Sequence, residues 1–305
     1  MSAINSIHSG NHVPRCHRPS LAELGDDLLH VSKARLLLTL SAPFILMAGY
    51  AFFSSVHMWP IAVLCVMALS FITYGSTSHD LVHRTLKLPR RTNDLLLRII
   101  ELLSLRSGTA YRLSHLHHHA HLLSPDDIEG ESAHHNLWYA IISGPALQLR
   151  LWLWAWRHHP PMRKKLLIEL LSIIALITLS VVAIRWSLAP LVYTLLVIAG
   201  SWVFPVITVF IPHNGHASES LAKTRLFRSR FAQLIAFDHL YHLEHHLYPA
   251  VPHHHWKKLA NRLDPYFVSE GVLPFDIKTS PSLAPPPQPV VETLPGPQNN
   301  HTSVQ

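Results

Sequence analysis

Histidine is more frequent in this chain than structural use alone requires, with 26 among 305 residues. Three groups of histidines have helical spacing, and side chains at i, i+3 and i+4 lie on one face of a helix. Histidine is also the commonest metal ligand in proteins. The spacing therefore gives eight candidate imidazole ligands: His79, His83, His115, His118, His119, His242, His245 and His246. A pair of histidines at the membrane surface is the alternative interpretation of the first cluster, His79 and His83, taken alone.

Eight imidazole nitrogens are too many for one zinc ion, which takes four ligands in a closed site. Their number favours two metal ions with open positions. Imidazole suits zinc, copper, iron and nickel alike, so the ligand type does not select the metal. Two carboxylates, Asp80 and Glu244, lie within the clusters. We interpret them either as solvated groups or as partners that orient ring N–H groups.

Two further segments contain residues that could add metal ligands. In the second cluster, YRLSHLHHHAH, His117 and His121 add imidazoles to those already counted. After an apolar segment, the patch IPHNGH contains His213 and His216, which could add a ligand, and Asn214, which could hold a metal-bound water. An ordinary turn at the membrane surface is the alternative interpretation of this patch.

Membrane helices are the elements that must position these clusters. Only 14% of the residues are charged and 49% are hydrophobic, whereas about a quarter of a soluble domain is charged. Four apolar segments reach the length of about 20 residues that a spanning helix needs. They are 36–56, 60–78, 166–184 and 190–212, and the short turns HMWP and RWSLAP join them into two hairpins.

The distribution of basic residues predicts the orientation. The two turns contain one, Arg185, whereas the segment 79–165 contains twelve. The positive-inside rule therefore places both termini and the histidine clusters in the cytoplasm, and we expect a bacterial inner membrane. The net charge of +7 is carried between apolar spans. Anionic lipid headgroups are accordingly the expected partner, and nucleic acid is not.

Two further apolar segments are too short or too polar to span. Residues 94–108 place Arg98, Glu101 and Arg106 opposite an apolar face, which predicts an interfacial helix. Residues 136–156 are rich in tryptophan and contain Gly144-Pro145, which predicts a broken segment that lies on or re-enters the interface. A fifth span is the alternative, but it would break the charge pattern.

The predicted fold class is an all-α integral membrane protein with four transmembrane helices in two hairpins, interfacial helices and a cytoplasmic histidine-rich cap. We expect residues 1–30 to form a flexible cytoplasmic arm and residues 31–275 to form one membrane-embedded domain. Residues 276–305 are rich in proline, which predicts a disordered tail.

The three clusters resemble the histidine boxes of the membrane fatty acid desaturase and hydroxylase superfamily, in its bacterial type. That family carries H-x(3,4)-H, H-x-x-H-H and H/Q-x-x-H-H in this order, and here the boxes read HDLVH, HLHHH and HLEHH. The segment LYPAVPHHHWKKL after the last box is similar to the family's tail. The likeness covers roughly residues 35–270, and the combination of three boxes is much more specific than one box alone.

The resemblance implies a non-haem di-iron centre held by the eight histidines, with His213 or a neighbour completing the ligand set. It also implies O2 as cosubstrate. Electrons would come from a separate ferredoxin or cytochrome, because the HPGG haem motif of a fused cytochrome domain is absent. The extra imidazoles of the second box leave the choice among His117, His118, His119 and His121 open.

The implied reaction is the O2-dependent oxidation of an unactivated C–H bond in a lipid, and fatty acyl desaturation is the first hypothesis. Carotenoid hydroxylation or ketolation is the alternative, because bacterial carotenoid enzymes share the boxes and have a similar IPH before the last one. A divalent-metal transporter is a distant third. Transporters place ligands near the bilayer midplane, and the middles of the predicted spans contain no histidine.

Overall fold

The computed structural model describes residues 17–275. Over this range the chain is helical, and its only bridge of β type joins His213 and Thr224. The predicted tail and residues 1–16 of the predicted arm lie outside the described residues. The helices are α1 Leu21–Leu24, α2 Lys33–Ser55, α3 Trp59–Ile72, α4 Ser78–His83, α5 Arg90–Leu103, α6 Gly108–Ala120, α7 Leu137–His158, α8 Arg163–Val182, α9 Ala189–Ser201, α10 Arg230–Ile235, α11 His242–Leu247 and α12 Trp256–Ser269.

Among the described residues, four helical stretches are long and apolar enough to cross a membrane. They are Asp26–Ser55, Trp59–His83, Pro160–Arg185 and Ala189–Phe210. Each contains nearly all of one predicted span, which confirms the prediction of four transmembrane helices in an all-α fold. The second stretch continues beyond its predicted end and carries the first histidine cluster within it.

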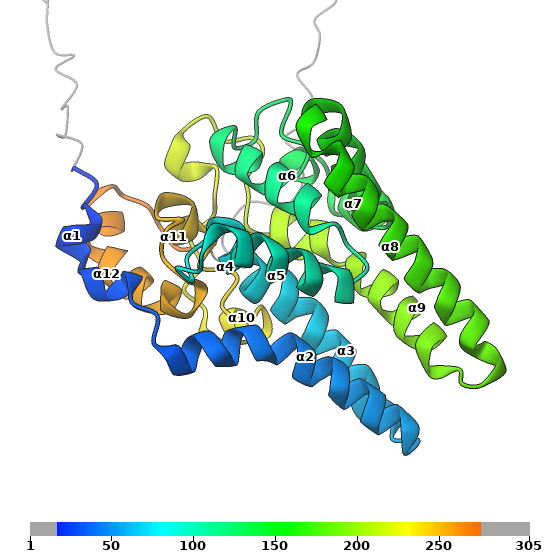
Figure 1. Cartoon of the computed structure of the whole chain (residues 1–305). Coiled ribbons are helices and arrows are strands. Elements are labelled where there is room, and N and C mark those ends of the chain that lie inside the picture. Colours follow the sequence, from blue (N-terminus) through cyan, green and yellow to red (C-terminus); the bar gives the residue numbers. More distant parts are fainter. Residues whose placement is uncertain (1–16, 276–305) are drawn as a thin grey trace, which may run out of the picture.

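The spanning helices form two groups that extend from a compact cap, α2 with α3 at the lower edge and α8 with α9 at the right of the view (Figure 1). Helix α2 packs along α3, and α8 packs along α9. A buried cluster of Tyr50, Ala62, Val66, Tyr193 and Val197 joins α2, α3 and α9. The two tyrosine hydroxyls are satisfied, since Tyr50 donates to the Ala189 carbonyl at 2.5 Å and Tyr193 donates to the Leu103 carbonyl at 2.6 Å.

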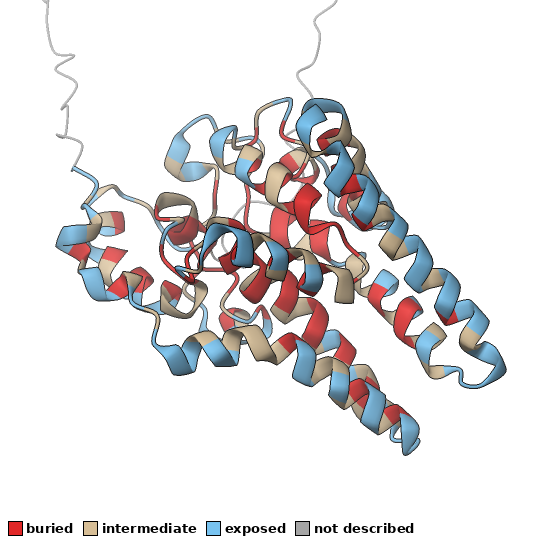
Figure 2. Ribbon diagram, in the orientation of Figure 1, coloured by how far each residue is buried: buried red, intermediate tan, exposed pale blue. Residues whose placement is uncertain are grey.

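The outer faces of the spans are apolar and exposed, whereas the buried residues concentrate where the helices enter the cap (Figure 2). Leu37 and Leu179, for example, are 70% and 62% exposed. Soluble proteins rarely expose so many large apolar side chains in a continuous band. Exposing apolar side chains to water is unfavourable, but in a bilayer these side chains contact lipid acyl chains and not water.

A buried carboxylate ties the third span to the cap. Glu169 of α8 accepts hydrogen bonds from Arg98 Nε at 2.8 Å and from Thr109 Oγ1 at 2.6 Å, and also from the Ser107 hydroxyl. Ser107 is the N-cap of α6, because its Oγ accepts from the Ala110 N–H. A charge buried near the membrane is tolerated only with such partners. The network therefore fixes the start of α6 relative to α8, and with it the direction of α6.

The prediction that Glu101 and Arg106 lie on the exposed polar face of an interfacial helix is wrong. The segment 94–108 contains most of α5 and the turn that leads to α6. Glu101 and Arg106 form an ion pair at 2.7 Å, and their side chains are 0% and 1% exposed. Arg106 also donates to Thr73 Oγ1 at 2.9 Å and lies over the rings of Tyr74 and Phe204. The periodicity suggested solvent for these charges, but they neutralise each other inside the cap.

The predicted break at Gly144-Pro145 is also absent, because α7 is continuous through both residues. The helix is not among the candidate spans of the described chain. Gly144 serves close packing instead. A Cβ there would lie 2.4 Å from the Trp202 carbonyl oxygen, so only glycine lets α7 touch the end of α9 so closely.

Part of the predicted N-terminal arm is packed. Ser20 and Glu23 form a capping box that starts α1. Leu24 and the fully buried Leu28 then lie in one apolar cluster with Trp256 and Leu263 of α12. Residues 20–29 therefore cover the face of α12 opposite the membrane helices (Figure 1).

Candidate metal centre

The first histidine cluster lies on a helix that continues the second span. Helix α3 passes through a π-helical turn, Thr73–Thr77, directly into α4, so His79 and His83 share one face as predicted. The helix ends at once after His83. Arg84 takes the left-handed conformation, and Thr85 N–H donates to the Asp80 carbonyl in a Schellman motif.

The other two clusters face the first from separate helices. Helix α6 presents His115, His118 and His119 on its inner side. The short helix α11 presents His242, His245 and His246. Trp256, which is fully buried, stacks on His245 with ring centroids 4.7 Å apart and so braces α11 against α12.

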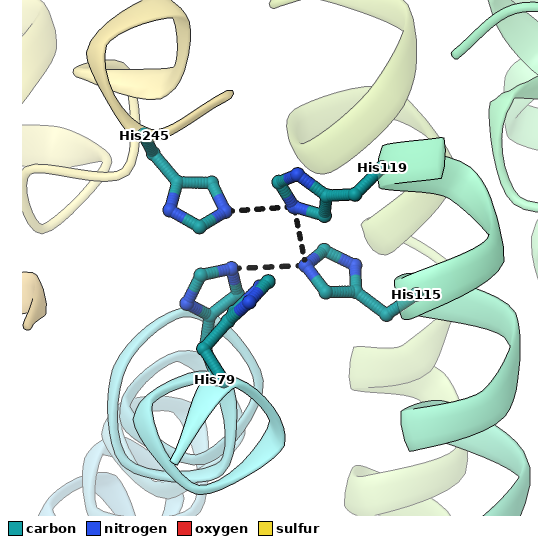
Figure 3. A group of neighbouring side chains, drawn as sticks. His79, His115, His119 and His245 are labelled. Carbon is teal, nitrogen blue, oxygen red and sulfur yellow. Dashed lines mark hydrogen bonds between the residues drawn. The ribbon is translucent and has the colours of Figure 1, made fainter. Parts of the chain in front are cut away.

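The structure brings all eight predicted ligands together in two groups. The first contains His79, His83, His115, His119 and His245, and Figure 3 shows four of these rings directed at one point. Neighbouring Nε2 atoms are 3.1 Å apart for His79 and His115, 3.2 Å for His115 and His119, and 2.8 Å for His119 and His245.

The second group contains His118, His213, His242 and His246. The His246 Nε2 atom lies 3.1 Å from that of His242 and 3.2 Å from that of His213. The groups are adjacent, because α6 contributes to both and the rings of His119 and His246 stack at 4.3 Å. His213, an open candidate in the sequence, thus joins the site from a turn that comes after a π-helical segment, Pro205–Phe210.

These spacings match the edges of a metal coordination shell. Two nitrogens at right angles around an ion, each about 2.1 Å from it, are about 3.0 Å apart. The observed Nε2 separations of 2.8, 3.1 and 3.2 Å lie on both sides of this value. In addition, the His83 Nε2 atom is buried and has no hydrogen-bond partner among the described residues. The residues present therefore fit two imidazole-bound metal ions.

Hydrogen bonds to Nδ1 direct the other nitrogen of three rings toward the centre. Glu129 lies 2.8 Å from His115 Nδ1, Asp127 lies 2.7 Å from His118 Nδ1, and the Val209 carbonyl lies 3.0 Å from His213 Nδ1. Each Nδ1–H donates to an oxygen, which leaves the Nε2 lone pair free for a metal. Partners of this kind also fix ring orientation and raise ligand basicity.

Burial keeps most of these imidazoles neutral. It lowers the pKa of His119, His213, His242, His245 and His246 well below the usual range, and the neighbouring imidazoles lower it further. For His118 burial also lowers the pKa, but the Asp127 carboxylate outweighs it and the net shift is upward. A metal ligand must be the neutral ring, so the site is prepared for cation binding without a prior loss of protons from most of its members.

The comparison with protein families decides the identity. The fatty acid desaturase family model matches residues 53–277, which include all nine clustered histidines. The chain belongs to the fatty acid desaturase family. A comparison with curated proteins finds no match. Membership implies an oxygen-dependent oxidoreductase that modifies lipids, and it agrees with the membrane spans and the histidine clusters that the structure displays.

Several predicted candidates of this desaturase-family protein lie outside the two groups. His117 and His121 lie on the outer side of α6 with Asp126, so the structure selects His118 and His119 from the extra imidazoles of the second box. His216 is exposed. Asn214 uses its side-chain oxygen to accept from the His216 N–H at 3.3 Å.

The two carboxylates singled out in the sequence have other roles. Asp80 accepts from Thr85 Oγ1 at 2.9 Å and from the His253 N–H at 2.8 Å, so it links α4 to the segment before α12. Glu244 is fully buried and forms an ion pair with Arg228 at 2.6 Å. Within the described chain neither one bonds to a ring of the two groups and both are buried. The structure therefore supports neither of the two interpretations made from the sequence, as solvated groups or as partners that orient ring N–H groups.

Asp127 and Glu129 perform that role, and the sequence pattern did not reveal them. They lie 9 and 14 residues after the rings that they hold, in the loop between α6 and α7. Their side chains are 0% and 4% exposed. Both residues lie in the acidic motif PDDIEG, shortly after the second box. The helical spacing of the box does not predict contacts between its histidines and acids 9 to 14 residues further along the chain.

A cavity of about 390 Å³ adjoins the centre. Its lining is mixed: Phe71, Phe204 and Phe237 are among the apolar residues, and much of the rest of the wall consists of charged and polar side chains, including Arg35, Asp80, Asp238 and His239. The buried His239, whose pKa burial lowers to about 4, lies between the cavity and the second group, because its ring centroid is 4.9 Å from that of His242. An apolar chain that enters this cavity reaches the edge of the histidine groups.

Proposed function

We propose that the protein is a di-iron oxidoreductase that uses O2 to introduce a double bond into a fatty acyl chain. The observation that carries the proposal is the pair of adjacent imidazole groups, whose Nε2 atoms converge beside a cavity with a phenylalanine-lined wall, at one end of four spans. The family membership supports iron as the metal, since imidazole alone does not choose among iron, zinc, copper and nickel.

The two groups would each hold one ion. His79, His83, His115, His119 and His245 would hold the first, and His118, His213, His242 and His246 the second. When bound, the iron pair supplies the reduction of O2 and the oxidising power needed to break an unactivated C–H bond. The site carries no carboxylate among these nine residues, which distinguishes it from di-iron bundles built on Glu-x-x-His pairs.

The chain's own residues position the substrate and exclude water. An acyl chain that enters from the bilayer keeps its apolar surface out of water when it occupies the cavity lined by Phe71, Ile207 and Phe237. Tyr74 stacks between Tyr111 and Phe204 with ring centroids 4.5 and 4.4 Å away. This stack closes the cavity on the side of α6 and holds its wall rigid.

The electrons would come from a separate ferredoxin or cytochrome. Arg157, Arg163, Lys164 and Lys165 are exposed where α7 meets α8, and such a basic surface suits an acidic donor protein. Anionic lipid headgroups suit it too. Charge reversal at Lys164 and Lys165 should therefore slow electron transfer at low salt, if the donor docks there. The orientation proposed from the charge pattern places this surface and the metal centre in the cytoplasm.

The proposal is tested by metal and lipid analysis of the same preparations. Purified protein should contain about two irons per chain, and cells that express it should gain unsaturated acyl chains. His213→Ala should lose iron and turnover. The matched variant His216→Ala removes an exposed imidazole from the same turn and should retain both.

Three outcomes would contradict the proposal. One zinc per chain without iron would exclude di-iron chemistry. Oxidation confined to a carotenoid pool, in a host that makes β-carotene and saturated lipids, would replace the acyl substrate. Equal iron content in the His213→Ala and His216→Ala variants would show that His213 is not a ligand.

A further inference from the structure

Two histidines of the second box remain outside both metal groups. His117 and His121 lie on the outer side of α6, turned away from His118 and His119, and Asp126 of the following loop lies beside them. One ligand atom of each of these three residues lies within 4.8 Å of the others. The outer side of this helix therefore has a second, smaller cluster of residues that can bind a metal, separate from the histidines of its inner side.

The three side chains lie close enough together to share one metal ion. His117 lies in the last turn of α6 and His121 is the residue that caps this helix, and their rings stack at 4.1 Å. The His121 Nδ1–H donates to the His117 carbonyl at 3.2 Å, which leaves the His121 Nε2 lone pair free. The His117 Nε2 atom lies 3.2 Å from Asp126 Oδ2, and the Ser124 hydroxyl holds the other Asp126 oxygen at 2.5 Å.

The surroundings limit the freedom of His117 as well. Its ring packs on Trp154 of α7 at 4.8 Å, and its Nε2 atom is buried. A positioned ring loses less entropy when it binds an ion than a free surface side chain does. His121 and Asp126 are exposed, so an ion can reach these two residues from solvent, next to the buried His117 Nε2 atom.

We propose that His117, His121 and Asp126 bind a third divalent transition-metal ion, separate from the two buried groups. Two imidazoles and one carboxylate with open positions suit zinc, nickel, cobalt or copper. Magnesium and calcium prefer full shells of oxygen ligands, so they are excluded. Water completes the coordination shell at this surface.

The ion would also stabilise the loop that supports the buried centre. A cation held by His121 and Asp126 joins the end of α6 to the residue just before Asp127. Asp127 in turn orients His118 and accepts from the backbone N–H groups of Leu123 and Gly130. Surface binding therefore restrains the loop whose carboxylate faces the second metal group.

Zinc titration of the purified protein with its resident metals in place tests the site. Calorimetry should show one equivalent of Zn²⁺ bound beyond the resident metals, and Mg²⁺ should not compete. His121→Ala and Asp126→Asn should each weaken this binding at least tenfold. His216→Ala removes an exposed imidazole elsewhere and should leave it unchanged.

Unchanged zinc affinity in both His121→Ala and Asp126→Asn would overturn the proposal and would leave only a close pairing of the His117 ring with the Asp126 carboxylate. Iron content and gel filtration check that each variant folds. If His121→Ala misfolds, Asp126→Asn decides, because it keeps the size of the side chain. The result is independent of the proposed desaturation, since the readout is zinc bound and not turnover.

Discussion

At the scale of residues, the carboxylates behind the rings matter as much as the rings. Asp127 is buried, and although burial alone raises its pKa, His118 and two backbone N–H donors lower it to about 2. It therefore stays ionised at neutral pH beside the His118 ring. An ionised acceptor forms a stronger hydrogen bond with Nδ1–H than a neutral one, which holds the His118 lone pair on the metal position.

Asp127→Asn should weaken iron binding about 10- to 100-fold, the range seen when a partner behind a metal ligand is lost. The amide is similar in size but carries no charge. The measurement is iron retained per chain against increasing chelator.

Glu131→Gln is the matched control. Glu131 lies in the same loop, but it pairs with Arg150 and accepts from the Tyr139 hydroxyl at 2.7 Å, away from the rings. Equal iron loss in the two variants would mean that general loosening of the loop, and not the contact with His118, determines metal affinity.

At the scale of elements, π-helical turns precede two of the ligand-bearing segments. Thr73–Thr77 leads into His79, and Pro205–Phe210 leads toward His213. A π-helical turn accommodates an extra residue and rotates the next segment of the chain, and such turns are frequent at functional sites. Close helix packing holds these rotations in place. Gly144 of α7 provides it by contact with the end of α9, just before the second π-helical turn.

Gly144→Ala should destabilise the protein by about 1–3 kcal/mol, the usual cost of overpacking a filled contact. The added Cβ would meet the Trp202 backbone, which cannot move aside as a side chain can. Thermal unfolding of the detergent-solubilised protein measures the effect.

Ala146→Ser, on the exposed side of the same helix, should change stability by less than about 0.5 kcal/mol. A melting temperature of Gly144→Ala equal to that of wild type would show that α7 and α9 separate easily at this point.

At the scale of the whole molecule, the metal groups lie at one end of all four spans. The histidines come from α4, α6, α11 and the turn at His213, which together with α12 form the cap (Figure 1). The connection between α8 and α9 lies at the opposite end. A bilayer around the spans therefore separates this turn from the site.

Thiol labelling of intact cells should distinguish the two ends. In a background without Cys16 and Cys65, Ser187→Cys lies in the turn between α8 and α9, and Ser218→Cys lies in the cap; both positions are exposed. An impermeant reagent should label Ser187→Cys from outside and Ser218→Cys only after permeabilisation. The reverse pattern would refute the cytoplasmic placement of the cap that the positive-inside rule predicts.

The sequence by itself determined the local features. Long apolar runs identified the four spans, because each reaches the thickness of a bilayer. The i, i+3 and i+4 spacing placed His115, His118 and His119 on one side of α6, because that spacing is a property of any helix. The three boxes then identified the family.

Only the tertiary structure decided which faces meet. It divided the nine imidazoles into two groups, added His213 and set His117 and His121 aside. It also showed that Asp127 and Glu129, not Asp80 and Glu244, hold the rings, and it buried Glu101 against Arg106. The physical reason is the same in each case. A charged or polar side chain is buried when a distant segment supplies its partner. The periodicity of a single helix does not predict which distant segment that is.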